Sequence, residues 1–550
     1  MKNRKTKFMF VMGGVVSSLG KGIALASTAY LLQSRGINLT MLKIDPYINV
    51  DPGTMNPYQH GEVYVLDDGA ETDLDLGHYE RFTNLILTQK NNFTSGQIYQ
   101  TVITKERKGD YLGKTVQVVP HITDEIKRRI FDVAEGKDLI IVEIGGTIGD
   151  IEGQPFIEAI RQIRFDVGRE NTLYVILTLI PYIRVSGELK TKPTQHSVKE
   201  LQSLGIQPDI ILCRTEKPLT NEMKGKISLF CNVEKEAVIT AIDVKNVYEI
   251  PLKFHQEGLE NLVIKKLNLK CNSLSINEWE KMVYRIKHPE DRVDIAFVGK
   301  YTKLKESYKS LIEAFVHAGA KLNLSVNLNW VDAEQIDSSS TKNVLSNMDG
   351  MLVPGGFGER GIEGKIKAIK YARESKVPFL GICLGMQCAV IEFARDVAHL
   401  NNADSEEFHP EASCKIIHLA KKWTKDEKIV ERDEKSEKGG TMRLGAYPCQ
   451  IKKGTKAYQT YNKELIYERH RHRYEFNNDY RKVLKEKGLT ISGESPDGEF
   501  VEIAEIKNHP FFVGTQFHPE FKSRPLSPHP LILEFVKNAY EKRRTKEKHS

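Results

Sequence analysis

The sequence lacks the cysteine patterns that build disulfides or zinc sites. Its seven cysteines are scattered and odd in number, and no Cys-x-x-Cys pair occurs. Small secreted domains and zinc modules need paired, closely spaced cysteines. We therefore expect free thiols in a reducing compartment, which favours the cytoplasm.

Long apolar runs and a strong excess of one charge are also absent. No apolar run approaches the ~20 residues of a membrane span, and the short run from Phe8 to Met12 leads into glycines. We therefore expect neither a membrane segment nor a signal peptide. The net charge of +7 is modest for 550 residues. It suits anionic substrates and does not indicate a nucleic-acid-binding protein.

The chain is too long for one hydrophobic core, and its pattern predicts two doubly wound α/β domains. Short apolar runs alternate with amphipathic stretches, which is typical of parallel-sheet proteins. We expect a domain over 1–268, a linker with a helix over 269–292, a second domain over 293–541 and a solvated basic tail over 542–550. The charged segment 420–440 is expected to be a mobile insertion or lid. The expected strands are Lys7–Met12, Thr40–Ile44, Asp138–Ile144, Leu173–Leu179, Asp209–Cys213, Ala237–Ile242, Val293–Gly299, Leu324–Val331, Gly350–Pro354 and Val377–Cys383.

A cysteine in the second half stands on a sharp strand-to-helix turn. An apolar run leads into Gly381-Ile382-Cys383-Leu384-Gly385, and a helical pattern leads away from it. A thiol at a helix N-terminus is favoured as the thiolate, which is how a nucleophile elbow is built. The segment Gln516-Phe517-His518-Pro519-Glu520 supplies a base and a carboxylate. A buried core thiol is the ordinary interpretation of a lone cysteine, but the glycine frame and the distant His-x-Glu favour a catalytic one.

A glycine-rich loop follows the first expected strand. Gly13-Gly14-Val15-Val16-Ser17-Ser18-Leu19-Gly20-Lys21-Gly22 precedes a helix, so backbone N–H groups can approach phosphates while Lys21 adds a charge. The loop departs from a P-loop because five residues separate Gly14 from Gly20, and Gly22 replaces the hydroxyl residue that holds magnesium. Carboxylates must then hold the metal.

Several charges interrupt apolar or strand-end segments near this loop. Glu143 ends an apolar strand where open α/β sheets place ligands, and Asp75 is a second candidate for magnesium. Lys43 also lies in an apolar strand, and a lone buried lysine is costly, so it should meet a phosphate or a carboxylate. The stretch Lys190-Thr191-Lys192-Pro193-Thr194-Gln195 offers many donors for a second polyphosphate, although alone this signal is weak.

Together these segments resemble the CTP synthase family over nearly the whole chain. Besides the loops above, the matching segments are Lys43 to Tyr47, Asp51 to Met55, Gly61 to Val63, Glu143 to Glu152, Pro354 to Gly358 and Arg469 to Glu475. The resemblance implies an N-terminal P-loop-like amidoligase domain and a C-terminal class I glutamine amidotransferase domain. It implies that ATP phosphorylates the 4-oxygen of UTP and that ammonia from glutamine then displaces phosphate to give CTP.

The resemblance also implies roles for individual residues. Cys383 would be the nucleophile, His518 the base and acid, and Glu520 its orienting partner. Magnesium would be held by Asp75 and Glu143, with no organic prosthetic group. ATP would contact Ser18, Leu19, Gly20, Lys21, Gly22, Ile23, Lys43, Asp75, Ile242, Asp243 and Val244. UTP or CTP would contact Ser17, Asp150, Ile151, Glu152, Lys190, Thr191, Lys192, Pro193, Thr194, Gln195 and Lys226. Glutamine would contact Gly356, Leu384, Gly385, Met386, Gln387, Glu407 and Arg473, with oxyanion donors at Gly356 and Leu384.

Regulation and assembly follow from the same resemblance. His60 matches a histidine near the entrance of an internal ammonia passage, and Arg360 lies in a loop implicated in GTP activation. Glu359 stands where many members carry an aromatic or other residue, which leaves the strength of GTP control open. CTP is expected to inhibit, and the family forms homotetramers and, in some members, filaments.

Two other functions share part of the pattern. Another ATP-driven, glutamine-dependent amidoligase, acting on a carboxylate, would share the loop and the elbow but does not call for Lys-Thr-Lys-Pro-Thr-Gln. A nucleotide-switch ATPase with a vestigial amidase would need the magnesium hydroxyl that Gly22 replaces. It would also not retain Cys383, His518 and Glu520 together.

Overall fold

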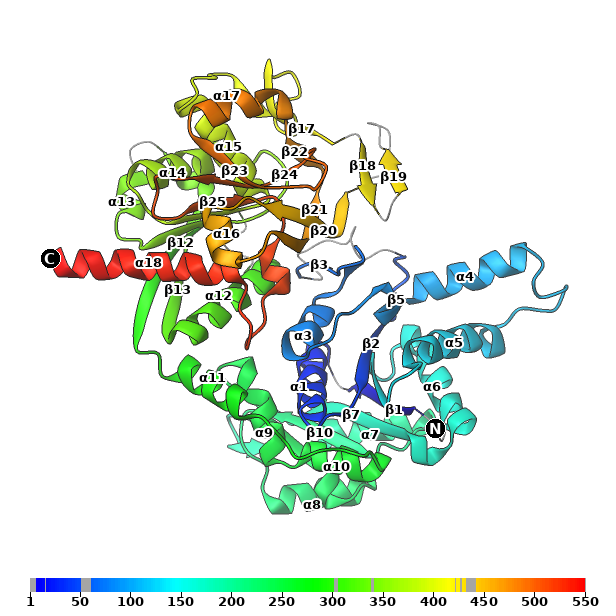
Figure 1. Cartoon of the computed structure of the whole chain (residues 1–550). Coiled ribbons are helices and arrows are strands. Elements are labelled where there is room, and N and C mark those ends of the chain that lie inside the picture. Colours follow the sequence, from blue (N-terminus) through cyan, green and yellow to red (C-terminus); the bar gives the residue numbers. More distant parts are fainter. Residues whose placement is uncertain are drawn as a thin grey trace. The chain divides into compact units, whose positions relative to one another are not determined.

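The computed structural model describes residues 6–14, 16–50, 61–300, 305–337, 341–420, 422–425, 428–431 and 442–549. The chain divides into two compact units, one of residues 1–52 and 74–280 and one of residues 53–73 and 281–550 (Figure 1). The division falls within helix α11 (Asn277–Lys287). The boundaries expected from the sequence stay a prediction, and the structure adds that the described segment 61–73 packs with the second unit.

A seven-stranded parallel sheet forms the centre of the first unit. Its order, β11-β10-β7-β1-β6-β2-β5, places the first strand in the middle, as in a doubly wound fold. Each strand expected in this half of the chain is present. The strands are β1 (Lys7–Gly13), β2 (Leu39–Asp45), β5 (Asn92–Thr94), β6 (Leu139–Ile144), β7 (Thr172–Leu179), β10 (Ile210–Thr215) and β11 (Val238–Ile242).

The two faces of this sheet differ in chemistry because side chains alternate along each strand. Phe10, Leu42 and Val142 belong to a purely apolar core on one face. Lys43 and Glu143 are the next residues along β2 and β6, so they point to the other face, and they are register partners. The strand pattern thus places one lysine beside one glutamate inside the unit.

Helices cover both faces of the sheet. Helices α4 (Ser95–Arg107), α5 (Thr123–Ala134), α6 (Gln154–Val167), α7 (Lys192–Ser203) and α8 (Asn221–Cys231) contribute to the apolar core on the Phe10 face. On the Lys43 face, α1 (Lys21–Gln33) packs against α3 (Leu74–Phe82), α9 (Ile250–Gln256) and α10 (Leu259–Leu267). A two-stranded ribbon, β8 (Tyr182–Ile183) and β9 (Glu188–Leu189), precedes α7.

A nine-stranded mixed sheet forms the centre of the second unit, in the order β13-β12-β14-β15-β25-β24-β23-β20-β21. The strands from β13 to β25 are parallel, and those from β25 to β21 are antiparallel. The parallel strands were expected from the sequence except β25, and the antiparallel ones were not. The strands are β12 (Asp291–Gly299), β13 (Leu324–Asp332), β14 (Gly350–Val353), β15 (Phe379–Ile382), β20 (Arg443–Ile451), β21 (Leu465–His472), β23 (Leu489–Glu494), β24 (Val501–Ile506) and β25 (Phe512–Thr515).

Two apolar cores flank this second sheet. Helices α14 (Ile362–Glu374) and α15 (Leu384–Asp396) pack on one face, and α12 (Lys309–Leu322) and α18 (Pro530–His549) on the other. Helix α18 continues through the segment expected to be a solvated tail, where Arg543 pairs with Asp294 at 3.2 Å. The shorter helices are α13 (Thr341–Leu345), α16 (Lys456–Tyr461) and α17 (Arg481–Glu486).

Short ribbons complete the second unit. One small sheet joins β16 (Ala403–Ser405), β17 (Cys414–Leu419) and β22 (Tyr474–Phe476), and the described part of the charged segment forms the hairpin β18 (Lys422–Lys425) and β19 (Lys428–Glu431). Another hairpin, β3 (Tyr64–Val65) and β4 (Glu71–Thr72), comes from the segment 53–73. Among the described residues, no helix is long and apolar enough to cross a membrane.

Candidate active sites

The glycine-rich loop of the first unit connects β1 to α1, and Lys21 folds back over it. Lys21 is the first residue of α1, and its Nζ donates to the carbonyl of Gly146 at 2.8 Å. A Cβ at Gly13 would lie 2.7 Å from that Nζ, so a side chain there would displace the lysine from this position. Burial lowers the pKa of Lys21. The loop therefore presents a preorganised cation beside backbone N–H groups, as phosphate binding requires.

Lys43 lies at the centre of a buried charge cluster next to this loop. Its Nζ donates to Glu143 Oε1 at 2.9 Å and also bonds Asp75, which stands in the first turn of α3. Burial raises the pKa of Glu143, whereas the pull of Lys43 holds the pKa of Asp75 below its usual value in spite of burial. Asp45 Oδ1 also lies 3.8 Å from the Lys43 Nζ, so three carboxylates confirm the expectation that a buried Lys43 meets a carboxylate.

The glycine at position 22 has a structural reason. A Cβ at Gly22 would lie 2.0 Å from Asp75 Oδ1, so the carboxylate occupies the space where a P-loop carries its hydroxyl side chain. Among the described residues no group of three or more His, Cys, Asp or Glu side chains is placed to hold a metal alone. Asp75 and Glu143 fit a Mg²⁺ ion that takes its other ligands from phosphates and water.

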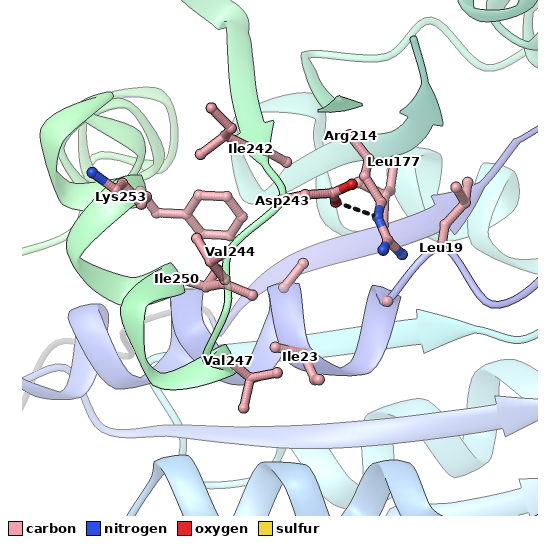
Figure 2. Close-up of a pocket in the computed structure, with 14 residues that line it drawn as sticks. Leu19, Ile23, Leu177, Arg214, Ile242, Asp243, Val244, Val247, Ile250 and Lys253 are labelled. Atoms are coloured by element: carbon pink, nitrogen blue, oxygen red, sulfur yellow. Dashed lines mark hydrogen bonds and ion pairs between the residues drawn. The ribbon is translucent and has the colours of Figure 1, made fainter. Parts of the chain in front are cut away.

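A cavity of about 340 Å³ opens beside the loop in the same unit. It is lined by Leu19 and Gly20 from the loop, Ile23 from α1, Ile242 at the end of β11, and Asp243 and Val244 after it. Figure 2 shows Arg214 and Asp243 on the same side of the cavity as Leu19, away from Lys253. Its apolar walls suit a flat aromatic ring, and the phosphate loop lies next to it.

Arg214 is a residue that the sequence interpretation missed. Its Nε donates to Asp243 Oδ1 at 2.9 Å, and its Nη1 donates to the carbonyl of Ser18 at 3.2 Å. It joins the phosphate loop to the segment that follows β11. Like Lys43 and Glu143, it is a charge near the end of an apolar strand, and that signal could have found it.

Cys383 forms the elbow of the second unit at the junction of β15 and α15. Its φ of 52° and ψ of −106° are strained for a residue other than glycine, which is the geometry of a nucleophile elbow. Glycines make the turn possible, since a Cβ at Gly385 would lie 2.0 Å from the carbonyl of Val353. The Sγ atom accepts from Nε2 of Gln516 at 3.7 Å.

His518 stands beside Cys383 and is oriented by Glu520. Its Nδ1 lies 2.8 Å from Glu520 Oε1. A Cβ at Gly355 would lie 2.9 Å from His518 Cε1 and 3.5 Å from Cys383 Cβ, so the glycine leaves room where the two side chains meet. Burial lowers the pKa of His518, but Glu520 and the thiol of Cys383 outweigh it and raise that pKa to about 10. The arrangement is that of a Cys-His-Glu triad.

Comparisons with known proteins identify the family of the chain. The family described as CTP synthase N-terminus matches residues 7–269, and the class I glutamine amidotransferase family matches residues 303–538. The chain is 60% identical to the CTP synthase of Oleidesulfovibrio alaskensis, over 97% of this chain and 98% of that protein. It is also 60% identical to the CTP synthase of Carboxydothermus hydrogenoformans, over 96% and 98%. The chain belongs to the CTP synthase family.

Membership of the CTP synthase family confirms the family, the α/β fold class and the enzyme class that the sequence predicts. It decides against the other amidoligase and the nucleotide switch. A solved structure of the glutaminase domain of Trypanosoma brucei CTPS, with bound acivicin, is 36% identical, with a TM-score of 0.41 over 45% of this chain and 94% of that one.

Among the segments that the CTP synthase resemblance assigns to UTP or CTP, the one that begins α7 lies close to the phosphate loop. A Cβ at Gly14 would lie 2.5 Å from Cβ of Ser197, so the first turns of α7 pack against the loop. Thr191 accepts from the Gln195 amide at 3.1 Å, whereas Lys190 and Lys192 are exposed. Asp150 accepts from the Thr147 N–H at 2.7 Å. The other residues so assigned are described as well: Ser17, Ile151, Glu152, Pro193, Thr194 and Lys226.

The residues that the resemblance assigns to glutamine gather around the elbow. Gln387 donates to the carbonyl of Tyr474 at 3.0 Å, and Glu407 accepts from the Gly358 N–H at 2.7 Å. Burial raises the pKa of Glu407. Gly356 and Leu384 are neighbours, since a Cβ at Gly356 would lie 3.5 Å from Leu384 Cδ2.

Lys300 and Arg360 are linked by hydrogen bonds to each other and to the loop around Gly358. Arg360 donates to the carbonyl of Lys300 at 2.8 Å, and the Lys300 Nζ donates to the carbonyl of Gly358 at 3.2 Å. The positive charges of Lys300 and Arg473 both lower the pKa of Glu407, against the effect of burial.

The histidine proposed near the ammonia passage, His60, lies outside the described residues. Gln516 and Lys300 were missed as site residues, although Gln516 lies in the segment that supplies His518 and Glu520.

Proposed function

We propose that this chain aminates UTP to CTP with ammonia that it releases from glutamine, at the expense of ATP. The balanced reaction is UTP + ATP + glutamine + water → CTP + ADP + phosphate + glutamate. The observation that carries the proposal is the presence of two complementary sites in one chain. One unit holds a phosphate loop with Lys21 and the Lys43 cluster, and the other holds the Cys383 elbow.

The first unit is suited to phosphoryl transfer. The 4-oxygen of uracil is a poor leaving group, and a phosphoryl group from ATP converts it into a good one. Lys21 and Lys43 would bind and orient the phosphates, and the cavity beside Arg214 would take adenine. Magnesium bound with ATP would neutralise phosphate charge, held by Asp75 and Glu143.

The second unit is suited to glutamine hydrolysis. The Cys383 thiolate attacks the amide carbon, and the backbone N–H groups of Gly356 and Leu384 receive the developing oxyanion. His518 carries the proton from the thiol and gives it to the departing ammonia. Its pKa of about 10 favours the protonated imidazole at neutral pH, which has a proton to give to the leaving nitrogen. Water then hydrolyses the thioester, with His518 as base and Glu520 holding its orientation.

Regulation and assembly are part of the same proposal. CTP would inhibit at the segments around Ser17, Asp150 and Lys190–Gln195, where UTP also binds. GTP would activate through the loop that carries Arg360, whose guanidinium pairs with Glu334 at 3.2 Å. Ammonia would reach the first unit by a passage near His60. We further propose a cytoplasmic homotetramer, able to form filaments, with no nucleic-acid or membrane partner.

The test is to supply the purified full chain with ATP, magnesium and UTP, and either glutamine or ammonia. Conversion of uracil to cytosine is followed by absorbance, and glutamate release is followed in parallel. We expect CTP from both nitrogen sources. A Lys21→Ala variant should lose both activities, because the phosphate site serves both. Absence of CTP with either source in the unaltered chain would overturn the proposal.

A further inference from the structure

Strand β21 of the second unit supports the glutaminase triad through its backbone. The N–H of His518 donates to the carbonyl of Arg469 at 2.8 Å. The Sγ of Cys383 lies 4.0 Å from the carbonyl of Arg471. Any small movement of β21 along its length therefore reaches both the proposed nucleophile and the proposed base.

The arginine side chains of the same strand hold the β3–β4 hairpin, residues 61–72 (Figure 1). Arg471 Nε donates to Glu71 Oε1 at 2.8 Å. Arg469 bonds Asp67 and also donates to the Tyr64 hydroxyl at 2.9 Å. The Glu71 side chain is only 3% exposed, so its pairing with Arg471 is well shielded from water.

The opposite face of β21 is fixed by a buried ion-pair network, which holds the strand in position. His470 lies on that face, with Nε2 2.6 Å from Glu502 Oε2. Glu502 also accepts from Arg443 at 2.8 Å, and all three side chains are buried. Alternation along the strand thus separates a structural face from a face that holds the hairpin.

The hairpin is fitted closely to the unit by further contacts. A Cβ at Gly445 would lie 2.6 Å from the carbonyl of Asp67, so only glycine permits this approach. The Tyr64 hydroxyl donates to the carbonyl of Phe521 at 2.8 Å, and the Phe521 ring stacks on His518 with centroids 5.2 Å apart. Arg471 also lies over the Phe357 ring, 5.4 Å from its centroid, in the loop that carries Gly356. The hairpin thus contacts supports of the base, the nucleophile and the oxyanion loop.

The chain leads directly from this hairpin to the phosphate site. Four residues after Glu71 stands Asp75, which bonds Lys43. A stretch of four residues spans at most about 14 Å. A change in the position of Asp75 when nucleotide binds must be absorbed within that short stretch or passed to Glu71.

We propose that Glu71 and Arg471 form a positioning pair that couples the phosphate site to the glutaminase triad. The pair keeps β21, and with it Cys383 and His518, in the arrangement that hydrolyses glutamine when Asp75 is engaged by nucleotide. Neither residue touches a reacting atom. The inference rests on the proposed roles of Cys383 and Asp75, and its claim concerns the coupling between the two reactions.

The experiment compares Glu71→Gln and Arg471→Lys, singly and together, in the full chain. The control is Asp68→Asn, which removes an exposed charge from the same hairpin and keeps an oxygen for the Ala70 N–H. Three rates are measured for each: CTP from ammonia, CTP from glutamine, and glutamate release with and without ATP plus UTP. The unaltered chain first establishes that CTP forms from both nitrogen sources, which tests the proposed function separately.

We expect each single variant to reduce the stimulation of glutamate release by ATP plus UTP about fivefold or more, with CTP formation from ammonia within about twofold of the unaltered chain. The double variant should be no worse than either single one, because the two residues act as a unit. The control should behave as the unaltered chain. Normal stimulation in both single variants would overturn the proposal, as would a parallel loss of ammonia-dependent activity, which indicates general damage to the fold.

Discussion

The hydrogen bond between His518 and Glu520 allows the sharpest test of the proposed glutaminase site. The two atoms, Nδ1 and Oε1, lie 2.8 Å apart, and both side chains are largely buried. Glu520→Gln removes the charge at nearly constant volume. A hydrogen bond to a charged group contributes about 1.5–3 kcal/mol, which corresponds to about 10- to 150-fold in rate. A glutamine amide can also select the wrong imidazole tautomer, which raises the loss toward about 10⁴-fold.

The same variant has a definite pH signature. Burial alone would lower the pKa of His518, and Glu520 is the largest influence that raises it to about 10. In the unaltered chain the imidazolium therefore persists through neutral pH and is lost only as pH rises toward 10. In Glu520→Gln the imidazolium should already be lost as pH rises through ~6.5, the ordinary pKa of histidine. The residual activity should then fall between pH 6 and 8, where the unaltered chain keeps its imidazolium.

The assay follows glutamate release and CTP formation at several pH values, with glutamine or with ammonia as the nitrogen source. Ammonia-dependent CTP formation is the internal control, since Glu520 lies in the other unit from the phosphate loop. It should change by less than about twofold. Glutamate release within about threefold of the unaltered chain would refute the role of Glu520, as would an unshifted pH profile.

Three further predictions concern both sites. Cys383→Ala should abolish CTP formation from glutamine and leave the ammonia-dependent rate intact, which the same absorbance assay measures. Lys43→Met should remove the lysine that neutralises the buried carboxylates Asp75 and Glu143. It should lower the unfolding free energy by about 3–5 kcal/mol in urea titrations and abolish both CTP-forming activities. Arg214→Ala should raise the KM for ATP about tenfold while the KM for UTP stays unchanged, because its contacts are confined to the loop and cavity.

Most parallel strands of the two sheets could be predicted from the sequence because they are buried on both faces. Such strands appear as continuous apolar runs, and β1, β6 and β12 lie where those runs are. In a run of this kind a charged residue stands out. Lys43 and Glu143 were found in that way, and the structure places them side by side.

The antiparallel half could not be predicted in the same way. Strand β21 has the sequence Leu-Ile-Tyr-Glu-Arg-His-Arg-His, which by residue type indicates an exposed segment. Its polar residues are instead buried by pairing with distant partners, such as Glu502 with His470. Pairing of this kind depends on residues 32 positions apart in the chain, and no local period reveals it.

The packing of residues 61–72 with the second unit was also beyond the sequence. The hairpin follows the phosphate-loop segments in the chain, and its motif residues match the synthetase part of the family. Its location depends on Arg469 and Arg471, which lie about 400 residues further on. Charge complementarity over such a separation becomes visible only once the chain is folded.

Two of the glycines at the sites, Gly22 and Gly355, mark close contacts rather than turns. At Gly22 and Gly355 the backbone conformation would admit any residue, and what excludes a side chain is the neighbour, Asp75 in one case and His518 in the other. A turn glycine is recognised from its local sequence, whereas a contact glycine is explained only by the group that fills its space. Gly22 therefore departs from the P-loop pattern because the Asp75 carboxylate fills the space of the usual hydroxyl side chain. Relative to a P-loop, the glycine and the aspartate are a single, linked change.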